Sequence, residues 1–107
     1  MNTNDIYCDE ILNGKIRVEI LKETENFLAF YHTNPMYTFH VIIAPKKHVL
    51  DLLSLDDFSK ISEVFQIAVD IIKEKQLEGY MIRVGGGSFQ HTKHLHFHLL
   101  AGLQLHT

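Results

Sequence analysis

Apolar and polar residues alternate strictly in one stretch near the C-terminus, residues 94–100, which read HLHFHLL. A period of two residues is typical of a β-strand, because successive side chains of a strand point to opposite faces of the sheet. We therefore expect Leu95, Phe97 and Leu99 to point into a core. The positions between them would line the opposite face with three imidazoles, those of His94, His96 and His98.

Four earlier segments also have the pattern of strands: residues 17–23, 27–31, 39–44 and 80–84. The first two are separated by the short polar segment 24–26, which predicts a hairpin. The third contains the run Val41-Ile42-Ile43, which indicates burial on both faces and therefore a central place in the sheet. A polar segment around Pro35 predicts the loop before this strand, and Pro45 is expected to end it.

Between residues 54 and 79 the hydrophobic period changes to 3.6, which predicts one long helix. Ser54 is the expected N-cap, and Gly79 is the expected stop signal. One apolar stripe would face the sheet, and its members are Phe58, Ile61, Val64, Phe65, Ala68, Ile71 and Ile72. A shorter helix is predicted over residues 6–12, where Asn13-Gly14 would end it.

Together these elements predict an α+β fold in a single domain spanning residues 1–107. We expect an antiparallel sheet of about five strands with one long and one short helix. The strand at 80–84 would leave an edge with only Arg83 as a charge, and such edges tend to pair. A homodimer is therefore expected, in which this strand and the long helix form a two-fold interface.

Composition argues against several classes of protein. The chain has 10 basic and 13 acidic residues, a formal net charge of −3, which does not suit a protein that coats nucleic acid. No apolar run approaches the ~18 residues of a membrane span, and the N-terminus is polar. The single Cys8 cannot form an internal disulfide and suits a reducing compartment. We expect a cytoplasmic protein with neither a nucleic-acid nor a membrane partner.

Three histidines on one strand face are compatible with two chemistries. They can chelate Zn²⁺ together with a further ligand, or one imidazole can attack phosphorus while its neighbours handle protons. The flanking residues Gln90, Thr92 and Lys93 are not carboxylates, and the segment GGGS at 85–88 has backbone N–H groups that can hold an anion. These features favour phosphoryl chemistry and leave the metal site as the alternative.

The stretch HLHFHLL matches the His-φ-His-φ-His-φ-φ signature of the histidine triad (HIT) family, in which φ is a hydrophobic residue. Three further segments resemble the family in the same order: residues 8–16 (CDEILNGKI), 26–30 (NFLAF) and 40–48 (HVIIAPKKH). The chain is most similar to the Hint-like branch. This resemblance implies a HIT-like fold, a homodimer, no cofactor, and a purine nucleotide or nucleotide conjugate as the bound partner.

An activity is also implied by the resemblance: hydrolysis or nucleotidyl transfer at the α-phosphate of a nucleoside phosphoramidate, an acyl-nucleotide or a dinucleoside polyphosphate. His96 matches the family nucleophile, which becomes transiently nucleotidylated. His98 matches the residue on the phosphate and leaving-group side. His94 matches a histidine that supports the nucleophile by hydrogen bonding, and His40 matches one that completes this network.

Residues that match nucleotide-binding positions of the family are Phe30, His32, Gln90, His91 and Thr92. The chain departs from the family pattern at three places. His32 stands where an acidic residue usually binds the ribose hydroxyls, and Gly85 stands where Asn or Gln often ends the fourth strand. Phe89 replaces a small residue before Gln90, where its bulk would narrow the approach of a phosphate. These departures leave the identity of the substrate open.

Two alternative functions follow from the same residues. The departures at His32 and Gly85 are compatible with a nucleotide-binding or sensor protein that turns over little substrate. A metal-dependent enzyme would instead use the three histidines of the triad as ligands. Cys8 and His48 match zinc ligands of some bacterial members, but Asp5 replaces the first of their two cysteines, so no complete zinc site is expected.

Overall fold

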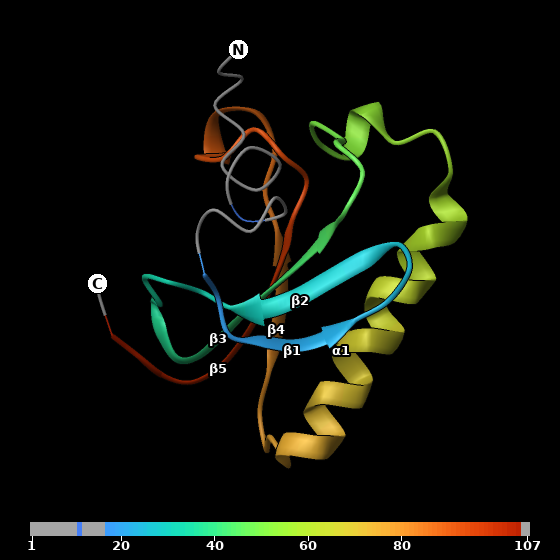
Figure 1. Ribbon diagram of the computed structural model, residues 1–107. Helices are drawn as coiled ribbons and strands as arrows, with labels where there is room; N and C mark the ends of the chain where they lie inside the picture. Colours follow the sequence, from blue (N-terminus) through green and yellow to red (C-terminus); the bar gives the residue numbers. More distant parts are fainter. Residues whose placement is uncertain (1–10, 12–16, 106–107) are drawn as a thin grey trace.

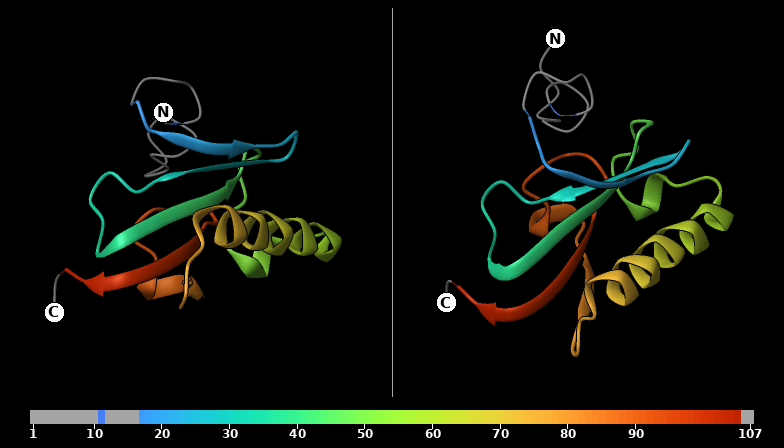
Figure 2. Two further views of the ribbon diagram at one scale, coloured as in Figure 1. Left: turned by 90° about the horizontal axis from the view of Figure 1, so that it is seen from below. Right: turned by 60° about the horizontal axis from the view of Figure 1, so that its bottom comes forward.

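In the part of the chain that the structure describes, five antiparallel strands form one sheet, and one long helix lies across one of its faces (Figure 1, Figure 2). The computed structural model describes residue 11 and residues 17–105. The strands, listed in chain order, are β1 (Ile20–Glu23), β2 (Phe27–Tyr31), β3 (Tyr37–Pro45), β4 (Met81–Val84) and β5 (Phe97–Gln104). The helix α1 spans Ile61–Lys75. The predicted α+β arrangement is confirmed.

The order of strands across the sheet is β1-β2-β3-β5-β4. β3 lies in the centre, as its buried run predicts, and it pairs with β2 on one side and with β5 on the other. Because β5 returns from the far end of the chain to pair with β3, it separates β3 from the edge strand β4. This topology places residues about 58 positions apart in sequence, such as His40 and His98, on neighbouring strands.

The two faces of the sheet have different coverings. On one face, α1 buries Val64, Ile67, Ala68 and Ile71 against alternate strand residues, among them Val41, Ile43, Phe97 and Leu99. The opposite face carries a smaller apolar cluster of Ile11, Leu28, Phe30, Ile42 and Ala44. His40 and His98 alternate with the helix-side residues of β3 and β5 and therefore belong to this second face.

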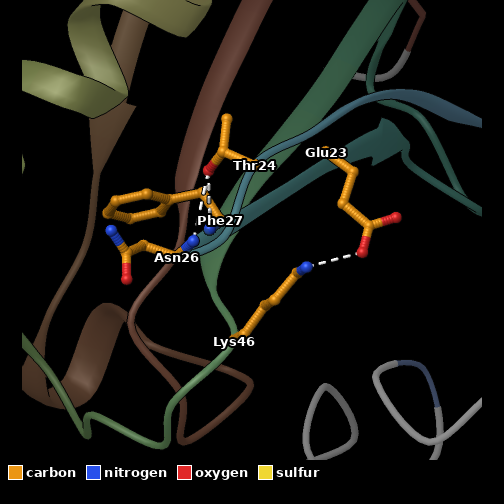
Figure 3. A network of polar contacts seen from close by, with 5 residues as sticks. All are labelled: Glu23, Thr24, Asn26, Phe27 and Lys46. Atoms are coloured by element: carbon orange, nitrogen blue, oxygen red, sulfur yellow. Dashed lines mark hydrogen bonds and ion pairs between the residues drawn. The ribbon is translucent and has the colours of Figure 1, made fainter.

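A hairpin joins β1 to β2 where the polar segment 24–26 predicts one (Figure 3). The Thr24 hydroxyl accepts hydrogen bonds from the backbone N–H groups of Asn26 and Phe27, at 3.3 and 3.0 Å. An ion pair between Lys46 and Glu23 links the end of β3 to β1. The pair is solvent-exposed, so its contribution is small, about 0–1 kcal/mol. The Thr24 bonds fix the turn instead.

The helix begins later than the sequence pattern predicts. Ser54 is not its N-cap, because Leu52–Ser54 and Phe58–Lys60 form two separate 3-10 turns ahead of Ile61. The carboxylates of Asp51 and Asp57 accept from the backbone N–H groups of Leu53 and Ser59, and such local bonds compete with a continuous helix. Phe58 consequently lies outside the helix and is 64% exposed. The predicted apolar stripe is correct from Ile61 onward with the exception of Phe65.

At its other end the helix stops before Gly79. Gln76 adopts the left-handed conformation with φ of 54°, and its N–H donates to the carbonyls of Ile72 and Lys73. A non-glycine residue therefore provides the C-cap. Phe65, predicted to face the sheet, is 45% exposed, because the buried side of α1 is centred on Val64 and Ala68. The predicted helix over residues 6–12 lies outside the described residues except for Ile11, which is buried.

The histidine stretch enters the sheet later than its alternation predicts. β5 begins at Phe97, so His94, Leu95 and His96 precede the strand. The Leu95 N–H donates to the Val49 carbonyl at 2.6 Å rather than to a neighbouring strand. Our prediction that His94 lies on an exposed strand face is wrong, since its side chain is fully buried. Within the described part of the chain, no helix is long and apolar enough to cross a membrane.

Candidate functional site

Four imidazoles gather on the face of the sheet opposite α1. His40 comes from β3 and His98 from β5, while His32 follows β2 and His96 precedes β5. Ring centroids are 4.4 Å apart for His32 and His40, 5.1 Å for His40 and His98, and 4.8 Å for His96 and His98. We call these four residues the histidine cluster. The chain thus brings together rings that lie up to 66 positions apart in sequence.

Hydrogen bonds fix the tautomers of His40 and His98. The backbone N–H of Met36 donates to His40 Nδ1 at 3.0 Å, so this nitrogen is an acceptor and the proton of a neutral ring is on Nε2. His40 Nε2 lies 2.9 Å from His98 Nδ1 and donates to it. A neutral His98 then carries its own proton on Nε2. The chain of bonds ends with an N–H donor on His98.

The ring of His96 has the opposite arrangement. Its Nδ1 lies 2.7 Å from the backbone carbonyl oxygen of His94, and a carbonyl oxygen can only accept. The proton of a neutral His96 is therefore on Nδ1, and the lone pair is on Nε2. An imidazole can attack only through an unprotonated nitrogen, and in a neutral His96 that nitrogen is Nε2.

His94 acts on His96 through its main chain. The buried ring of His94 donates from Nε2 to the Pro45 carbonyl at 2.7 Å and packs edge-on against His48, with centroids 5.4 Å apart. These contacts anchor the segment before β5 to the end of β3. The anchored segment in turn holds the His94 carbonyl in place for the ring of His96. The His94 side chain is fully buried and supports His96 through the main-chain carbonyl of its own residue.

Burial keeps the hydrogen-bonded pair neutral. Desolvation is the largest cause that lowers the pKa of His98 to about 3, with smaller contributions from the charges of His96, His40, His32 and Arg83. Desolvation also lowers the pKa of His40 to about 4, ahead of the charges of His32, Arg83 and His96. Burial lowers the pKa of His32 as well. Near neutral pH the rings of His40 and His98 are therefore neutral, in the tautomers that their hydrogen bonds assign.

A pocket of about 380 Å³ opens beside His98. Its lining comes from β3, β4, β5 and the loop after β4, and consists of Met36, Tyr37, His40, Arg83, Val84, Gly85, Gly86, Phe89, His91, His98 and Leu100. Phe89 is 84% exposed, so its ring stands at the rim of this pocket and does not block it. A second pocket, of about 390 Å³, lies between the sheet and the start of α1, and no residue of the histidine cluster lines it.

The expected nucleotide-binding residues are not brought to one place. Phe30 is 1% exposed and belongs to the apolar cluster with Leu28 and Ile42, so its ring is part of the core. Gln90 is also buried; its side-chain amide donates to the Leu50 carbonyl, and its backbone N–H donates to the Gly87 carbonyl at 3.0 Å. The side chain and N–H of Gln90 therefore shape the loop rather than face a ligand.

His91 and Thr92 follow Gln90 on the same loop. His91 is exposed and lines the pocket beside His98, whereas Thr92 is half-buried. His32 belongs to the histidine cluster, and its Nδ1 accepts from the Asn34 N–H at 2.9 Å. A neutral His32 therefore presents an N–H donor from Nε2, where an acidic residue would present acceptor oxygens.

No group of three or more histidine, cysteine, aspartate or glutamate side chains in the described part of the chain is arranged to hold a metal ion. The rings of His40 and His98 are instead turned toward each other by their hydrogen bond. Of the residues considered for a zinc site, His48 is described and packs against His94, while Asp5 and Cys8 lie outside the described residues.

The family model for the HIT domain matches residues 13–105 of the chain. The protein belongs to the histidine triad family. An uncharacterized HIT-like protein of Methanocaldococcus jannaschii is 32% identical over 102 residues, covering 89% of this chain and 76% of that protein. An adenosine 5′-monophosphoramidase of Danio rerio, named HINT3, is 30% identical over 101 residues, covering 90% of this chain and 63% of that protein.

Solved HIT structures share the whole fold. A histidine triad protein from Clostridium difficile superposes with a TM-score of 0.86 at 33% identity, covering 100% of this chain and 97% of its own. A HIT family hydrolase from Legionella pneumophila gives a TM-score of 0.84 at 30% identity, covering 95% and 96% of the two chains. The HIT-like fold expected from the signature is confirmed.

One residue of the HIT domain's pocket was not among the candidates from sequence. Arg83 lies on β4 directly opposite His98 on β5, and it lines the pocket together with His40 and His98. The sequence does contain a signal, because Arg83 is the polar member of the alternating run Met81-Ile82-Arg83-Val84. Its neighbourhood depends on the pairing of β4 with β5, which the local pattern does not specify.

Proposed function

We propose that this HIT-family protein acts at the α-phosphate of a nucleoside phosphoramidate, an acyl-nucleotide or a dinucleoside polyphosphate, as a hydrolase or nucleotidyl transferase. The observation that carries the proposal is the bond from His96 Nδ1 to the His94 carbonyl, which prepares Nε2 for attack. The hydrolase from Legionella pneumophila, at 30% identity, and the phosphoramidase of Danio rerio support a hydrolase as the general class.

The reaction would proceed through two displacements at phosphorus. Nε2 of His96 attacks the α-phosphorus, the bond to the leaving group breaks, and its electron pair departs with that group. The nucleotide is then held on His96 as an N-phosphoryl imidazolium. Water attacks this intermediate, releases the nucleoside monophosphate with a proton, and restores neutral His96. Two moderate barriers replace one high barrier.

His98 would assist as a hydrogen-bond donor. The bond from His40 uses Nδ1 of His98 as acceptor, so the proton of His98 is held on Nε2. This N–H can stabilise charge that develops on a phosphate oxygen or on the leaving group. The low pKa of His98 means that the ring acts as a neutral donor rather than as an imidazolium. A leaving amine would therefore take its final proton from solvent.

A second candidate function is nucleotide binding with little turnover. The observation that favours it is His32, which offers an N–H donor where the family's usual acidic residue would accept from ribose hydroxyls. A poorly held ribose would place the α-phosphate less accurately, and small displacements lower rates strongly. A binding or sensor protein would keep the fold and the cluster but release its nucleotide unchanged.

We further infer that two copies of the chain associate, in a reducing compartment such as the cytoplasm. β4 is an edge strand of the sheet, and its outer surroundings carry exposed apolar side chains. Tyr80, Met81 and Leu103 line a pocket at this edge, and Phe65 and Val69 are exposed on α1. A two-fold axis beside β4 would bury them and would pair the open strand edge. Sedimentation that gives the mass of one chain at micromolar concentration would contradict this inference.

The test of the activity uses an adenosine 5′-phosphoramidate and follows the appearance of AMP. Wild-type protein should release AMP, and wild-type protein denatured in alkali, which preserves the acid-labile phosphorus–nitrogen bond, should carry a labelled adenylyl group. His96→Ala should do neither. If wild type releases no AMP but binds the nucleotide, the result would support nucleotide binding with little turnover and contradict the proposed enzyme activity. A chelator control tests the alternative of a metal-dependent enzyme. Activity should survive the chelator, since attack by a histidine does not require a metal.

A further inference from the structure

The register of the sheet places Arg83 next to the reaction centre. Arg83 on β4 is the direct partner of His98 on β5, and partners in an antiparallel pair project to the same face. Ile82 and Val84, the neighbours of Arg83, pack against the helix-side core. Arg83 therefore stands on the opposite face, the face of the histidine cluster.

The charge of Arg83 is available to a ligand. Ion pairs among the described residues join Lys22 to Glu74 and Lys46 to Glu23, and neither includes Arg83. Its guanidinium contacts the sulfur of Met81 at 3.8 Å, which does not neutralise it. Arg83 is exposed, and among the residues that line the pocket beside His98 it is the one with a permanent charge.

The rest of the pocket is suited to an anion. Its other polar side chains are those of Tyr37 and of three histidines, one of which is His98 with the N–H on Nε2, and none of the described residues that line it is a carboxylate. Gly85 and Gly86 add backbone without side chains at the rim, where a Cβ on Gly86 would have only Asp51 within 4 Å, at 3.9 Å. The positive charge of Arg83 is felt at the cluster, since it contributes to the lowered pKa of both His40 and His98.

We propose that Arg83 binds the leaving group and selects an anionic one, so that the preferred substrate is a nucleoside polyphosphate cleaved between its α- and β-phosphates. This inference rests on the proposed function, because it assigns the departing half of the substrate. A guanidinium presents several donors in a planar fork that matches phosphate oxygens. A neutral amine would gain nothing from it.

The chemical step balances without a further reactant. The bond from His96 Nε2 to the α-phosphorus forms as the bond from that phosphorus to the bridging oxygen breaks. The electron pair stays on the bridging oxygen, which leaves as part of the β-phosphate. Arg83 and the N–H of His98 would share the charge that this oxygen acquires. Water then releases the nucleoside monophosphate from His96.

The experiment compares two substrates that share an adenylyl half. Diadenosine triphosphate has ADP as its leaving group, and an adenosine 5′-phosphoramidate has a neutral amine. Arg83→Gln should lower kcat/KM for diadenosine triphosphate about 10- to 100-fold, the range of a hydrogen bond to a charged group. The phosphoramidate should change less than about threefold. Arg83→Lys, which keeps the charge but not the fork, should fall between wild type and Arg83→Gln.

A second measurement needs no turnover of a polyphosphate. Inorganic tripolyphosphate should inhibit phosphoramidate cleavage by wild type, and the inhibition should weaken at least about tenfold in Arg83→Gln and also with rising salt. Equal loss for both substrates in Arg83→Gln, or unchanged inhibition, would overturn the assignment of Arg83. The two proposals fail separately. If wild type cleaves only the phosphoramidate, the leaving-group inference fails; if it cleaves neither substrate, the proposed function fails.

Discussion

The two halves of the site differ in how firmly the fold defines them. At the reaction centre, each ring of His40, His96 and His98 has a hydrogen bond that assigns its tautomer. Among the residues that match nucleotide-binding positions, Phe30 is buried in the core and the side chain of Gln90 donates to the Leu50 carbonyl. His32 offers a donor where the family usually offers acceptors. The hydrogen bonds of the histidine cluster are thus fixed by the framework of the sheet, whereas the residues that match nucleotide-binding positions are not gathered in one place.

The largest effect should come from removing the nucleophile. His96→Ala should lower turnover by about 10⁴-fold or more, because neighbouring groups do not supply a second attacking nitrogen. Nucleotide affinity should remain within about tenfold, since ground-state binding comes from other contacts. Single-turnover kinetics and equilibrium binding of AMP would measure the two quantities. Near-wild-type turnover by His96→Ala would contradict the assignment of His96 as the nucleophile.

A smaller and more selective effect is expected at His98. His98→Ala removes the N–H on Nε2, which matters most when the leaving group is poor. Turnover should fall about 10- to 100-fold for a phosphoramidate of a basic amine, and less than about tenfold for a good leaving group. A series of phosphoramidates with amines of graded pKa would show a steeper dependence in the variant. An equal fall in turnover across the series would indicate that His98 has only a structural role and does not assist the leaving group.

Stability should depend on pH through the same rings. The pKa values of His40 and His98, about 4 and about 3, lie below the ordinary 6.5 of a free histidine, so the unfolded chain binds more protons between these values. The contribution of these two neutral rings to the free energy of unfolding is complete above pH 6.5 and is lost as the pH falls toward 4. We expect about 2 kcal/mol of loss over this range, because solvent partly screens the ring charges.

Urea unfolding at a series of pH values would measure this change. A variant with His40→Asn should show a flatter dependence, since it removes one of the two shifted groups. Turnover should be limited by protonation of His40 and His98 only below about pH 4–5. A loss of activity well above that range would point to another group. A stability that does not change between pH 6.5 and pH 4 would contradict the neutral, buried pair.

The smallest effect is expected at the loop. Gln90→Ala removes the side-chain bond to the Leu50 carbonyl and should lower the free energy of unfolding by about 1–2 kcal/mol. Turnover per folded molecule should change less than about threefold, because Gln90 faces the loop interior. Thermal unfolding combined with active-site titration would separate the effect on stability from the effect on turnover per folded molecule. A large change in kcat with unchanged stability would instead indicate that Gln90 contacts the substrate.

The sequence predicts the fold well where a single local pattern decides. The bounds of β2 match the prediction, and the central place of β3 follows from its apolar run. The start of α1 is missed because Asp51 and Asp57 cap short turns of their own, and the hydrophobic period continues through these turns. Local periodicity does not reveal such a competition between caps.

The site is predictable in part for a similar reason. The alternation at 94–100 and the family signature single out the histidines, but alternation alone places His94 on an exposed strand face, whereas its contacts with Pro45 and His48 bury it. Arg83 gains its position from the pairing of β4 with β5, which brings it opposite a residue 15 positions later. Tertiary contacts of this kind are absent from any one segment of sequence.

The bond that orients His96 ends on a carbonyl oxygen of the main chain, and every amino acid has that oxygen. Mutation of residue 94 cannot delete the acceptor; it can only move it. A library randomised at this position and selected for turnover should therefore retain side chains that fill the volume of the His94 ring and donate to Pro45. Over evolutionary time, the nucleophile would be protected by the path of the chain rather than by the identity of its neighbour.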